Sequence, residues 1–172
     1  MNICGYYPES INEGEGLRAA VFISGCRHRC PGCFNPETWN FGYGEPFTPS
    51  RRRQIIGDMA ANPLLSGLTL AGGDPFFSAE EAAEFIGEVR GTLPDFPVWI
   101  YTGYTFEELA AMPGSPEWKL LSLCQVLIDG RFEEALKDTT LRFRGSSNQR
   151  IIDIQASLAG GAEPVLWQPV LL

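Results

Sequence analysis

The chain has 172 residues, of which 44% are hydrophobic and 20% charged, a composition that excludes a disordered protein. Its length is typical of one domain, so we expect a single domain over residues 1–172. Twenty-one Asp and Glu against thirteen Lys and Arg give a net charge of −8, which would repel a phosphate backbone and argues against a nucleic-acid partner.

Nothing in the sequence suggests export or membrane insertion. The first ten residues have no basic start, and no stretch approaches the roughly 18 apolar residues of a membrane span. We therefore expect a cytoplasmic protein with no membrane partner. Five cysteines are an odd number in such a chain, so metal ligation or catalysis is a better interpretation than disulfides.

Short apolar runs alternate with patterns of helical spacing along the chain. The runs predict strands over residues 17–23, 68–71, 98–102, 123–128 and 150–154. Helices are expected after the capping residues Thr48, Ser78, Thr105 and Ser115, with capping boxes at Ser78–Glu81 and Thr105–Glu108. Strands that alternate with helices indicate an α/β fold with a mostly parallel sheet.

The first four predicted strands end in segments that are suited to binding a ligand. These segments are the cysteine loop after residue 23, Gly72-Gly73-Asp74, Thr102-Gly103 and Asp129-Gly130. In parallel α/β folds the ligand site lies beyond the carboxyl ends of the strands, so one pocket is expected to collect all four.

The cysteine loop C-R-H-R-C-P-G-C contains Cys26, Cys30 and Cys33 in a C-x3-C-x2-C spacing. One short loop of this kind can wrap three thiolates around an iron-sulfur cluster. Because the other cysteines, Cys4 and Cys124, lie in separate segments, the fourth iron of a [4Fe-4S] cluster would stay open to a substrate.

A zinc site remains the alternative for this loop, with the three thiols joined by His28 or Cys4. We expect His28, the only histidine, to be a solvated loop residue rather than a ligand. Cys4 and Cys124 are expected to be structural, the latter as a small hydrophobe within an apolar strand.

CxxxCxxC after the first strand and GGDP after the second together resemble the signature of the radical S-adenosylmethionine (SAM) superfamily. The resemblance implies an open iron that chelates the amino and carboxylate groups of SAM, and reductive cleavage to methionine and a 5'-deoxyadenosyl radical. Gly72 and Gly73 would then let the backbone approach the methionine moiety, and Asp74 would accept from its amino group. The alternative for GGDP is an ordinary turn from strand to helix.

The superfamily pattern has an aromatic residue just before the third cysteine, where this chain has Gly32. Phe34 follows the cysteine instead, and the string C-P-G-C-F-N-P-E-T-W, with Asn35 and Trp39, is similar to the activating proteins of anaerobic ribonucleotide reductase. Other matching strings are Y-Y-P, S-G-C, GGDP, T-G-Y, V-L-I-D-G-R-F, L-K-D and R-G-S-S-N-Q-R-I-I-D.

That resemblance implies a shortened, laterally open partial (β/α) barrel of the radical SAM type, preceded by an N-terminal segment over 1–16. Gly32, Phe34 and Asn35 would join the glycine pair and Asp74 at the SAM pocket. Asp129 is a weaker candidate, since Asp-Gly often only forms a turn. The C-terminal tail, 155–172, lies outside the resemblance and its role stays open.

The implied activity is the generation of a glycyl radical on the large subunit of anaerobic ribonucleoside-triphosphate reductase. Reduction would come from an external donor such as flavodoxin, steered by Arg27 and Arg29 with the nearby run Arg51–Arg53. The segment Arg142–Asp153 contains many side-chain hydrogen-bond donors. Three roles are open for it: binding the partner's backbone, ordering the site, or forming a solvated turn. The alternatives are an activase of another glycyl radical enzyme, a small-molecule radical SAM enzyme and a zinc-bound interaction module.

Overall fold

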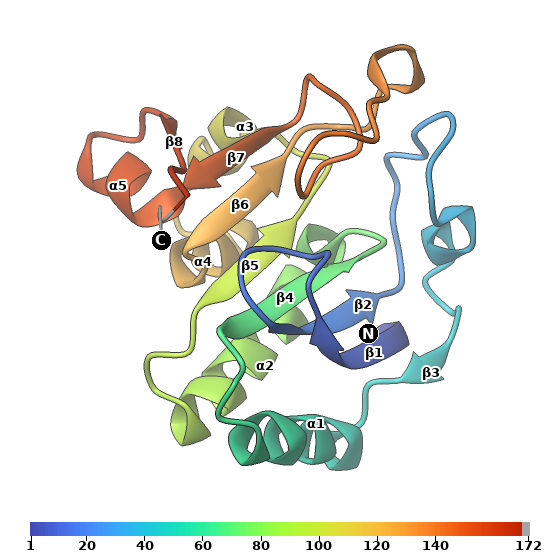
Figure 1. The fold of residues 1–172 in the computed structure, drawn as a ribbon, viewed down its shortest axis with the longest axis vertical. Coiled ribbons are helices and arrows are strands. Elements are labelled where there is room, and N and C mark those ends of the chain that lie inside the picture. The colour runs from blue at the N-terminus through green and yellow to red at the C-terminus, as the bar shows by residue number, and fades with distance from the viewer. Residues whose placement is uncertain (170–172) are drawn as a thin grey trace.

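A computed structural model describes residues 1–169 and contains one eight-stranded sheet in the order β3-β1-β2-β4-β5-β6-β7-β8 (Figure 1). The strands are β1 (Asn2–Ser10), β2 (Arg18–Ile23), β3 (Glu45–Pro46), β4 (Gly67–Gly72), β5 (Val98–Tyr101), β6 (Val126–Asp129), β7 (Arg150–Asp153) and β8 (Val165–Leu166). The helices are α1 (Pro49–Ala61), α2 (Ala79–Thr92), α3 (Phe106–Ala110), α4 (Pro116–Leu123) and α5 (Ile154–Ala159), with short 3-10 helices η1 (Pro36–Trp39), η2 (Pro75–Ser78) and η3 (Glu134–Leu136).

The sheet is mixed, which corrects the expectation of a mostly parallel one. Strands β2, β4, β5 and β6 are parallel, whereas β1, β3, β7 and β8 pair antiparallel at the two flanks. Strand β7 was correctly predicted, but it returns antiparallel to β6 because the segment between them contains only the short helix η3. The segment from 130 to 149 is long enough for a crossover but contains no α-helix that could pack on the sheet, and parallel returns are usually made through such a helix.

Helices α1, α2 and α4 lie on one face of the sheet, as Figure 1 shows. Side chains alternate along β5, so Val98 and Ile100 join the main core with these helices while Trp99 and Tyr101 point to the opposite face. We call this opposite face the open face. The loop over 11–17 crosses it, since the Thr69 hydroxyl donates to Glu13 O (2.7 Å) and Gly14 lies against Trp99.

Most predicted helix starts are confirmed. Thr48 and Ser115 accept the N–H of Arg51 (3.2 Å) and of Trp118 (3.0 Å), and Thr105 with Glu108 forms the complete capping box. The box at Ser78 is wrong: its side chain makes no cap hydrogen bond, because η2 runs directly into α2 and Glu81 pairs with the chain's amino group.

The predicted strand ends agree with the structure to within one residue except at the start of β6, and strands β1, β3 and β8 were not predicted. Strand β6 begins at Val126, because α4 continues to Leu123 and Cys124 is its buried C-cap. The long strand β1 was not predicted, since Gly5 and Pro8 interrupt its pattern; two register shifts in its pairing with β2 accommodate them. Across residues 1–169, every helix is too short or too polar to span a membrane.

Candidate functional site

A cavity of about 480 Å³ lies at the carboxyl ends of the four parallel strands. Its lining includes the three clustered cysteines and the predicted strand ends: Cys26, Cys30, Cys33, Ala71, Gly72, Gly73, Tyr101, Thr102, Gly103 and Gly130. The expected convergence of the strand ends is therefore confirmed. A second group of lining residues closes the cavity on the side of β6 and β7: Phe132, Asp138, Thr139, Leu141, Phe143, Arg144, Gly145 and Gln149.

The cysteine loop is shaped by two glycines with left-handed backbone. Gly25 (φ 107°) turns the chain out of β2, and Gly32 (φ 70°) allows the tight turn in which the N–H of Cys33 donates to Cys30 O (3.1 Å). Helix η1 then closes the loop, because the N–H of Gly25 donates to Thr38 O (2.7 Å). The sequence spacing thus folds into one compact loop that presents all three thiols to the cavity.

The donor set fits a multi-iron cluster. Burial raises the pKa of Cys26 to about 11, against the opposing effect of the backbone N–H groups of His28 and Arg29, and burial also raises the pKa of Cys30. The Cys33 sulfur accepts the N–H of Asn35 (3.4 Å), the kind of hydrogen bond that tunes cluster sulfurs. Because their pKa values are raised, the Cys26 and Cys30 thiols are protonated and neutral when no metal is bound. Binding of iron would displace these protons.

The zinc alternative needs His28 or Cys4 as a fourth ligand, and both side chains have other partners. The Cys4 thiol donates to Phe22 O (3.4 Å) and the fully buried Cys124 thiol to Leu121 O (3.3 Å), as expected for structural cysteines.

His28 is not the solvated residue that we expected from the sequence. Its side chain is 5% exposed, packs against Phe77 and Tyr104, and places Nε2 2.9 Å from Asp74 Oδ2. Because an ionised carboxylate only accepts hydrogen bonds, Nε2 is the donor. The histidine therefore ties the cysteine loop to the turn after β4.

Asp74 is buried and does not line the cavity. Besides His28, its carboxylate accepts the N–H of Phe76, the hydroxyl of Thr102 and the N–H of Gly103, each at 2.9 Å. It therefore joins the ends of β4 and β5. Its predicted contact with the amino group of SAM stays a prediction.

Gly72 and Gly73 line the cavity, and both are required by packing. Gly72 has a left-handed backbone (φ 100°), and a Cβ on it would lie 2.6 Å from Ile23 O. A Cβ on Gly73 would lie 2.6 Å from Gly25 O, at the start of the cysteine loop. A side chain at Gly73 would consequently disturb the cysteine loop as well as any ligand.

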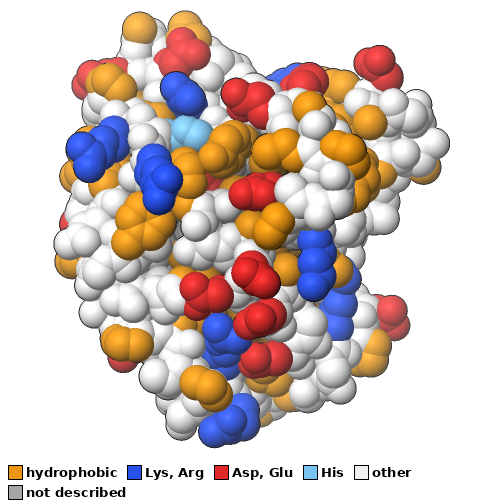
Figure 2. Space-filling model, turned by 180° about the vertical axis from the view of Figure 1, so that it is seen from behind, with side chains coloured by type: hydrophobic (Ala, Val, Ile, Leu, Met, Phe, Trp, Pro, Cys, Tyr) orange, Lys and Arg blue, Asp and Glu red, His pale blue; other side chains and the backbone are white. Residues whose placement is uncertain are grey.

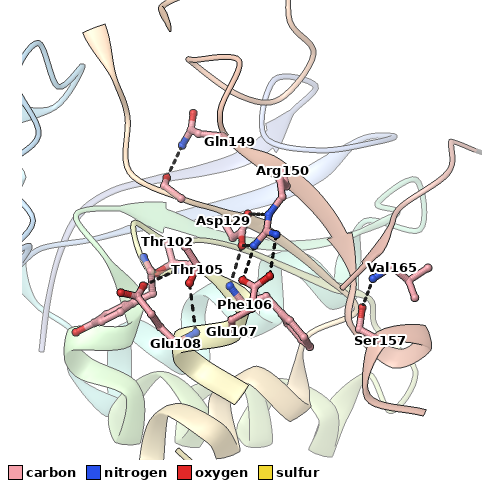
Figure 3. A network of polar contacts seen from close by, with 12 residues as sticks. Thr102, Thr105, Phe106, Glu107, Glu108, Asp129, Gln149, Arg150, Ser157 and Val165 are labelled. Atoms are coloured by element: carbon pink, nitrogen blue, oxygen red, sulfur yellow. Dashed lines mark hydrogen bonds and ion pairs between the residues drawn. The ribbon is translucent and has the colours of Figure 1, made fainter. Parts of the chain in front are cut away.

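Asp129 belongs to a buried network that Figure 3 shows in detail. Its carboxylate accepts the N–H of Phe106 (2.8 Å) and the Nε of Arg150 (3.0 Å), and Arg150 also pairs with Glu107. The carboxylate thus joins β6, β7 and α3, while the neighbouring Gly130 lines the cavity. A direct contact between Asp129 and SAM stays a prediction.

The polar string after residue 142 binds its own chain, which favours the interpretation that it orders the site. Gln149 Oε1 accepts the N–H of Gly145 (2.9 Å), and its Nε2 donates to Gly130 O (2.9 Å; Figure 3). Asn148 Nδ2 donates to Arg131 O (2.8 Å), and the buried Ser146 hydroxyl accepts the N–H of Glu133 (3.2 Å). These bonds fix the wall that closes the cavity.

Several lining residues were not singled out from the sequence as cofactor candidates, and three of them have unusual surroundings. Arg144 is the one Lys or Arg among the lining residues; its Nε is buried without a partner, and no described carboxylate pairs with it. Burial raises the pKa of Tyr101 far above its usual range, and the indole N–H of Trp39 is buried without a partner. Sequence reasoning missed them because the burial of a side chain and the partners of its polar atoms are known only once the fold is known.

The candidate Phe34 is 58% exposed at the cavity wall, and its ring packs on Phe132.

A second hollow lies on the other side of the cysteine loop. It shares Cys26 and Trp39 with the cavity and is otherwise lined by Arg27, Arg29, Pro36, Glu37, Asn40, Phe41 and Tyr43. Figure 2 shows basic side chains beside the histidine on this face. The run Arg51–Arg53 does not line this hollow: Arg51 bonds Glu45, and the buried Arg52 pairs with Glu81, Glu84 and Glu88.

Comparison with known proteins identifies the family. A model described as a 4Fe-4S single cluster domain matches residues 12–152. The anaerobic ribonucleoside-triphosphate reductase-activating protein of Escherichia coli (strain K12) is 40% identical over 152 residues, which is 87% of this chain and 96% of the relative. Its counterparts from Pasteurella multocida (strain Pm70) and Enterobacteria phage T4 are 42% and 35% identical, over 88% of this chain and 96% and 93% of their own lengths. With three cysteines of cluster spacing in one cavity, the chain belongs to the family of anaerobic ribonucleoside-triphosphate reductase-activating proteins.

Proposed function

We propose that this chain activates an anaerobic ribonucleoside-triphosphate reductase by generating a glycyl radical on its large subunit. The observation that carries the proposal is the grouping of Cys26, Cys30 and Cys33 in one cavity at the ends of the four parallel strands. When bound there, a [4Fe-4S] cluster would supply the electron that splits SAM into methionine and the 5'-deoxyadenosyl radical. That radical takes one hydrogen atom from a glycine of the reductase, which leaves 5'-deoxyadenosine and a glycyl radical.

The cavity suits a ligand of the size of SAM. Its volume of about 480 Å³ lies within the roughly 300–1,000 Å³ of small-molecule pockets. Gly72, Gly73 and Gly103 would bring backbone close to the ligand, with Asn35 and Phe34 at the wall by the cysteine loop. Asp74 and Asp129 would act indirectly, because their hydrogen bonds hold the strand ends that line the cavity in place.

Arg144 is the side chain in this cavity best suited to recognise the carboxylate of SAM. A guanidinium offers several donors, and here its buried Nε has no protein partner while another of its N–H groups donates to Gln149 O (2.8 Å). Arg53 is a control, because it is exposed on α1 and does not line the cavity.

Arg144→Met should therefore weaken SAM binding to the reconstituted protein by about tenfold to a hundredfold, the loss of one charge-assisted hydrogen bond or more. Arg53→Met should leave it unchanged. The measurement is the dissociation constant from the spectral change of the reduced cluster on addition of SAM. If Arg144→Met bound SAM normally yet failed to activate the reductase, the guanidinium would serve the protein substrate instead.

We also infer that the sheet is a shortened, laterally open barrel of the radical SAM type. In support, the four parallel strands carry helices on one face, and within residues 1–169 β3 and β8 remain unpaired edges. An opening at the side would admit a glycine loop of a large protein partner. A cytoplasmic location, where such a reductase acts, forms part of the same proposal.

Electrons would reach the cavity from an external donor of the flavodoxin type at the second hollow. Arg27 and Arg29 give this hollow a positive charge, and Cys26 and Trp39 separate it from the cavity. An acidic protein with a flat aromatic cofactor would suit the charge and the aromatic side chains Phe41 and Tyr43.

The test is anaerobic mixing of the reconstituted protein with its reductase, SAM and a reductant. The expected result is the doublet electron spin resonance signal of a glycyl radical, with release of 5'-deoxyadenosine. Replacing the reductase's radical-bearing glycine by alanine should abolish the signal. Cleavage of SAM without any radical on the reductase would contradict the proposal and favour another glycyl radical enzyme or a small molecule as the substrate.

A further inference from the structure

The end of the chain packs against the wall of the cavity although it lies outside the family match. The family model ends at residue 152, and the alignment with the Escherichia coli protein covers 96% of that protein but only 87% of this chain. Beyond residue 152 the structure adds α5 and β8, and the N–H of Trp167 donates to Ile151 O (2.9 Å). The tail is thus an ordered part of the sheet.

Trp167 belongs to a small apolar cluster on the open face, separate from the main core. Its ring meets the Trp99 ring edge to face with centroids 5.0 Å apart, and Phe143 packs on the same indole at 5.6 Å. Edge-to-face pairs of this kind stabilise a cluster beyond the burial of their apolar surface. Trp99, which is 4% exposed, is the centre of the cluster.

Other sides of Trp99 are also occupied. The Arg18 guanidinium lies 5.1 Å from its ring centroid, and a Cβ added to Gly14 would lie 2.8 Å from its ring. The loop over 11–17, the segment before Gly145 and the tail therefore meet on one side chain, which comes from the middle of β5.

This cluster lies directly beneath the cavity. Trp99 and Tyr101 are two residues apart on β5 and share the open face, and Tyr101 lines the cavity while Trp99 lies further from the strand's carboxyl end. Phe143 belongs to both the cluster and the cavity lining. Its backbone is left-handed (φ 59°), a conformation that is unfavourable for a non-glycine residue, so surrounding contacts must hold it.

We propose that Trp167 is a positioning residue for SAM. Trp167 packs on Trp99, and Trp99 packs on Phe143. These contacts keep Phe143 and the adjacent Arg144 in the positions from which they line the cavity. This inference rests on the proposed function and adds a role for the tail, which the family match does not include. It predicts that a change of the tail, remote from the cysteines, alters SAM binding without altering the cluster.

The experiment compares Trp167→Ala with Leu166→Ala, a neighbour in β8 that is 55% exposed. Both variants are reconstituted anaerobically, and iron and sulfide content, melting temperature and the dissociation constant for SAM are measured. Trp167→Ala should keep the full cluster and bind SAM about tenfold more weakly, as expected from losing one aromatic pair. Leu166→Ala should match the wild type, and Trp167→Phe should restore most of the affinity.

A second readout is the hydrogen exchange of the segment that contains Phe143 and Arg144. Hydrogen exchange of the peptide over 141–147 should be faster in Trp167→Ala than in the wild type, and unchanged in Leu166→Ala. If Trp167→Ala does not fold, Trp167→Leu replaces it, since leucine keeps apolar volume without the edge-to-face contact.

A lowered melting temperature with unchanged SAM affinity and unchanged exchange over 141–147 would overturn the proposal and leave Trp167 a merely structural residue. Failure of the wild-type protein itself to bind SAM would instead count against the proposed function, so the two failures are distinguishable.

Discussion

The carboxylate of Asp74 accepts hydrogen bonds from four groups on three segments of the chain. Burying a carboxylate without such partners would cost several kcal/mol, and these four donors offset that cost. The same bonds fix the relative positions of the cysteine loop, the turn after β4 and the end of β5. One buried side chain thus organises three of the four strand ends at the cavity.

Replacing single cysteines tests which thiols hold the cluster. Cys26→Ala, Cys30→Ala and Cys33→Ala should each lose most of the bound iron and sulfide, because only these three thiols line the cavity. The measurement is iron and sulfide per chain after anaerobic reconstitution.

Cys4→Ala and Cys124→Ala are the matched controls and should keep a full cluster. Cys124→Ala should lower the free energy of unfolding by about 1 kcal/mol, a typical value for a point mutation, since its thiol is fully buried. A full cluster in Cys30→Ala, or its loss in Cys4→Ala, would refute the assignment.

At the level of residues, spacing along the chain predicted only what lies close in sequence. The three cysteines lie within eight residues, so their shared loop was predictable. The burial of His28 was not, because its partner Asp74 lies 46 residues further along the chain. Arg144 and Tyr101 were missed for the same reason, since only the fold brings them to the cavity.

At the level of elements, Arg150 on β7 connects β6 to α3 through Asp129 and Glu107 (Figure 3). The hydrogen bonds from Arg150 hold the pKa of Glu107 at about 2, below its ordinary value of 4.5. A depressed pKa in the folded state adds stability above the unfolded pKa, and this stability disappears as the pH falls from about 4.5 through about 2.

Glu107→Gln should therefore lower the free energy of unfolding at pH 7 by about 0.5 kcal/mol, a modest value because the pair is partly solvent-exposed. The difference from the wild type should vanish as the pH falls toward 2. Urea unfolding from pH 7 to pH 3 measures it, with the exposed Glu163→Gln as a control that changes nothing. A difference that stayed constant down to pH 3 would mean that the ion pair with Arg150 is not its cause.

The predicted elements were those with a strong local pattern. Strands β2, β4, β5 and β6 are buried on both faces and read as continuous apolar runs, so all four were predicted. Strand β1 is half-exposed and contains Gly5 and Pro8, so its pattern is weak; its partner β2 establishes it as a strand. The direction of β7 likewise depends on its pairing with β6.

For the whole molecule, the distribution of charge decides how a donor protein approaches. The net charge of −8 would repel an acidic partner over most of the surface. Arg27 and Arg29 lie together at the hollow behind Cys26, where Arg27 also stacks on Phe41 (5.5 Å) and Phe77 (5.9 Å). An acidic donor should consequently be steered to the wall that separates this hollow from the cavity.

Charge reversal of both arginines tests this steering. The double variant Arg27→Glu and Arg29→Glu should be reduced by flavodoxin at least about tenfold more slowly at low ionic strength, since steering of this kind is worth roughly 10- to 1,000-fold. The difference should shrink as salt is added, because exposed charges are screened beyond about 8–10 Å at physiological ionic strength.

Arg53→Glu is the control, because Arg53 is equally basic and exposed but lies on α1 outside the hollow. Reduction by a small neutral photoreductant such as 5-deazariboflavin should be the same in all variants. Equal slowing with both reductants would mean that the substitutions damage the cysteine loop itself, and the hollow would then have no role in electron delivery.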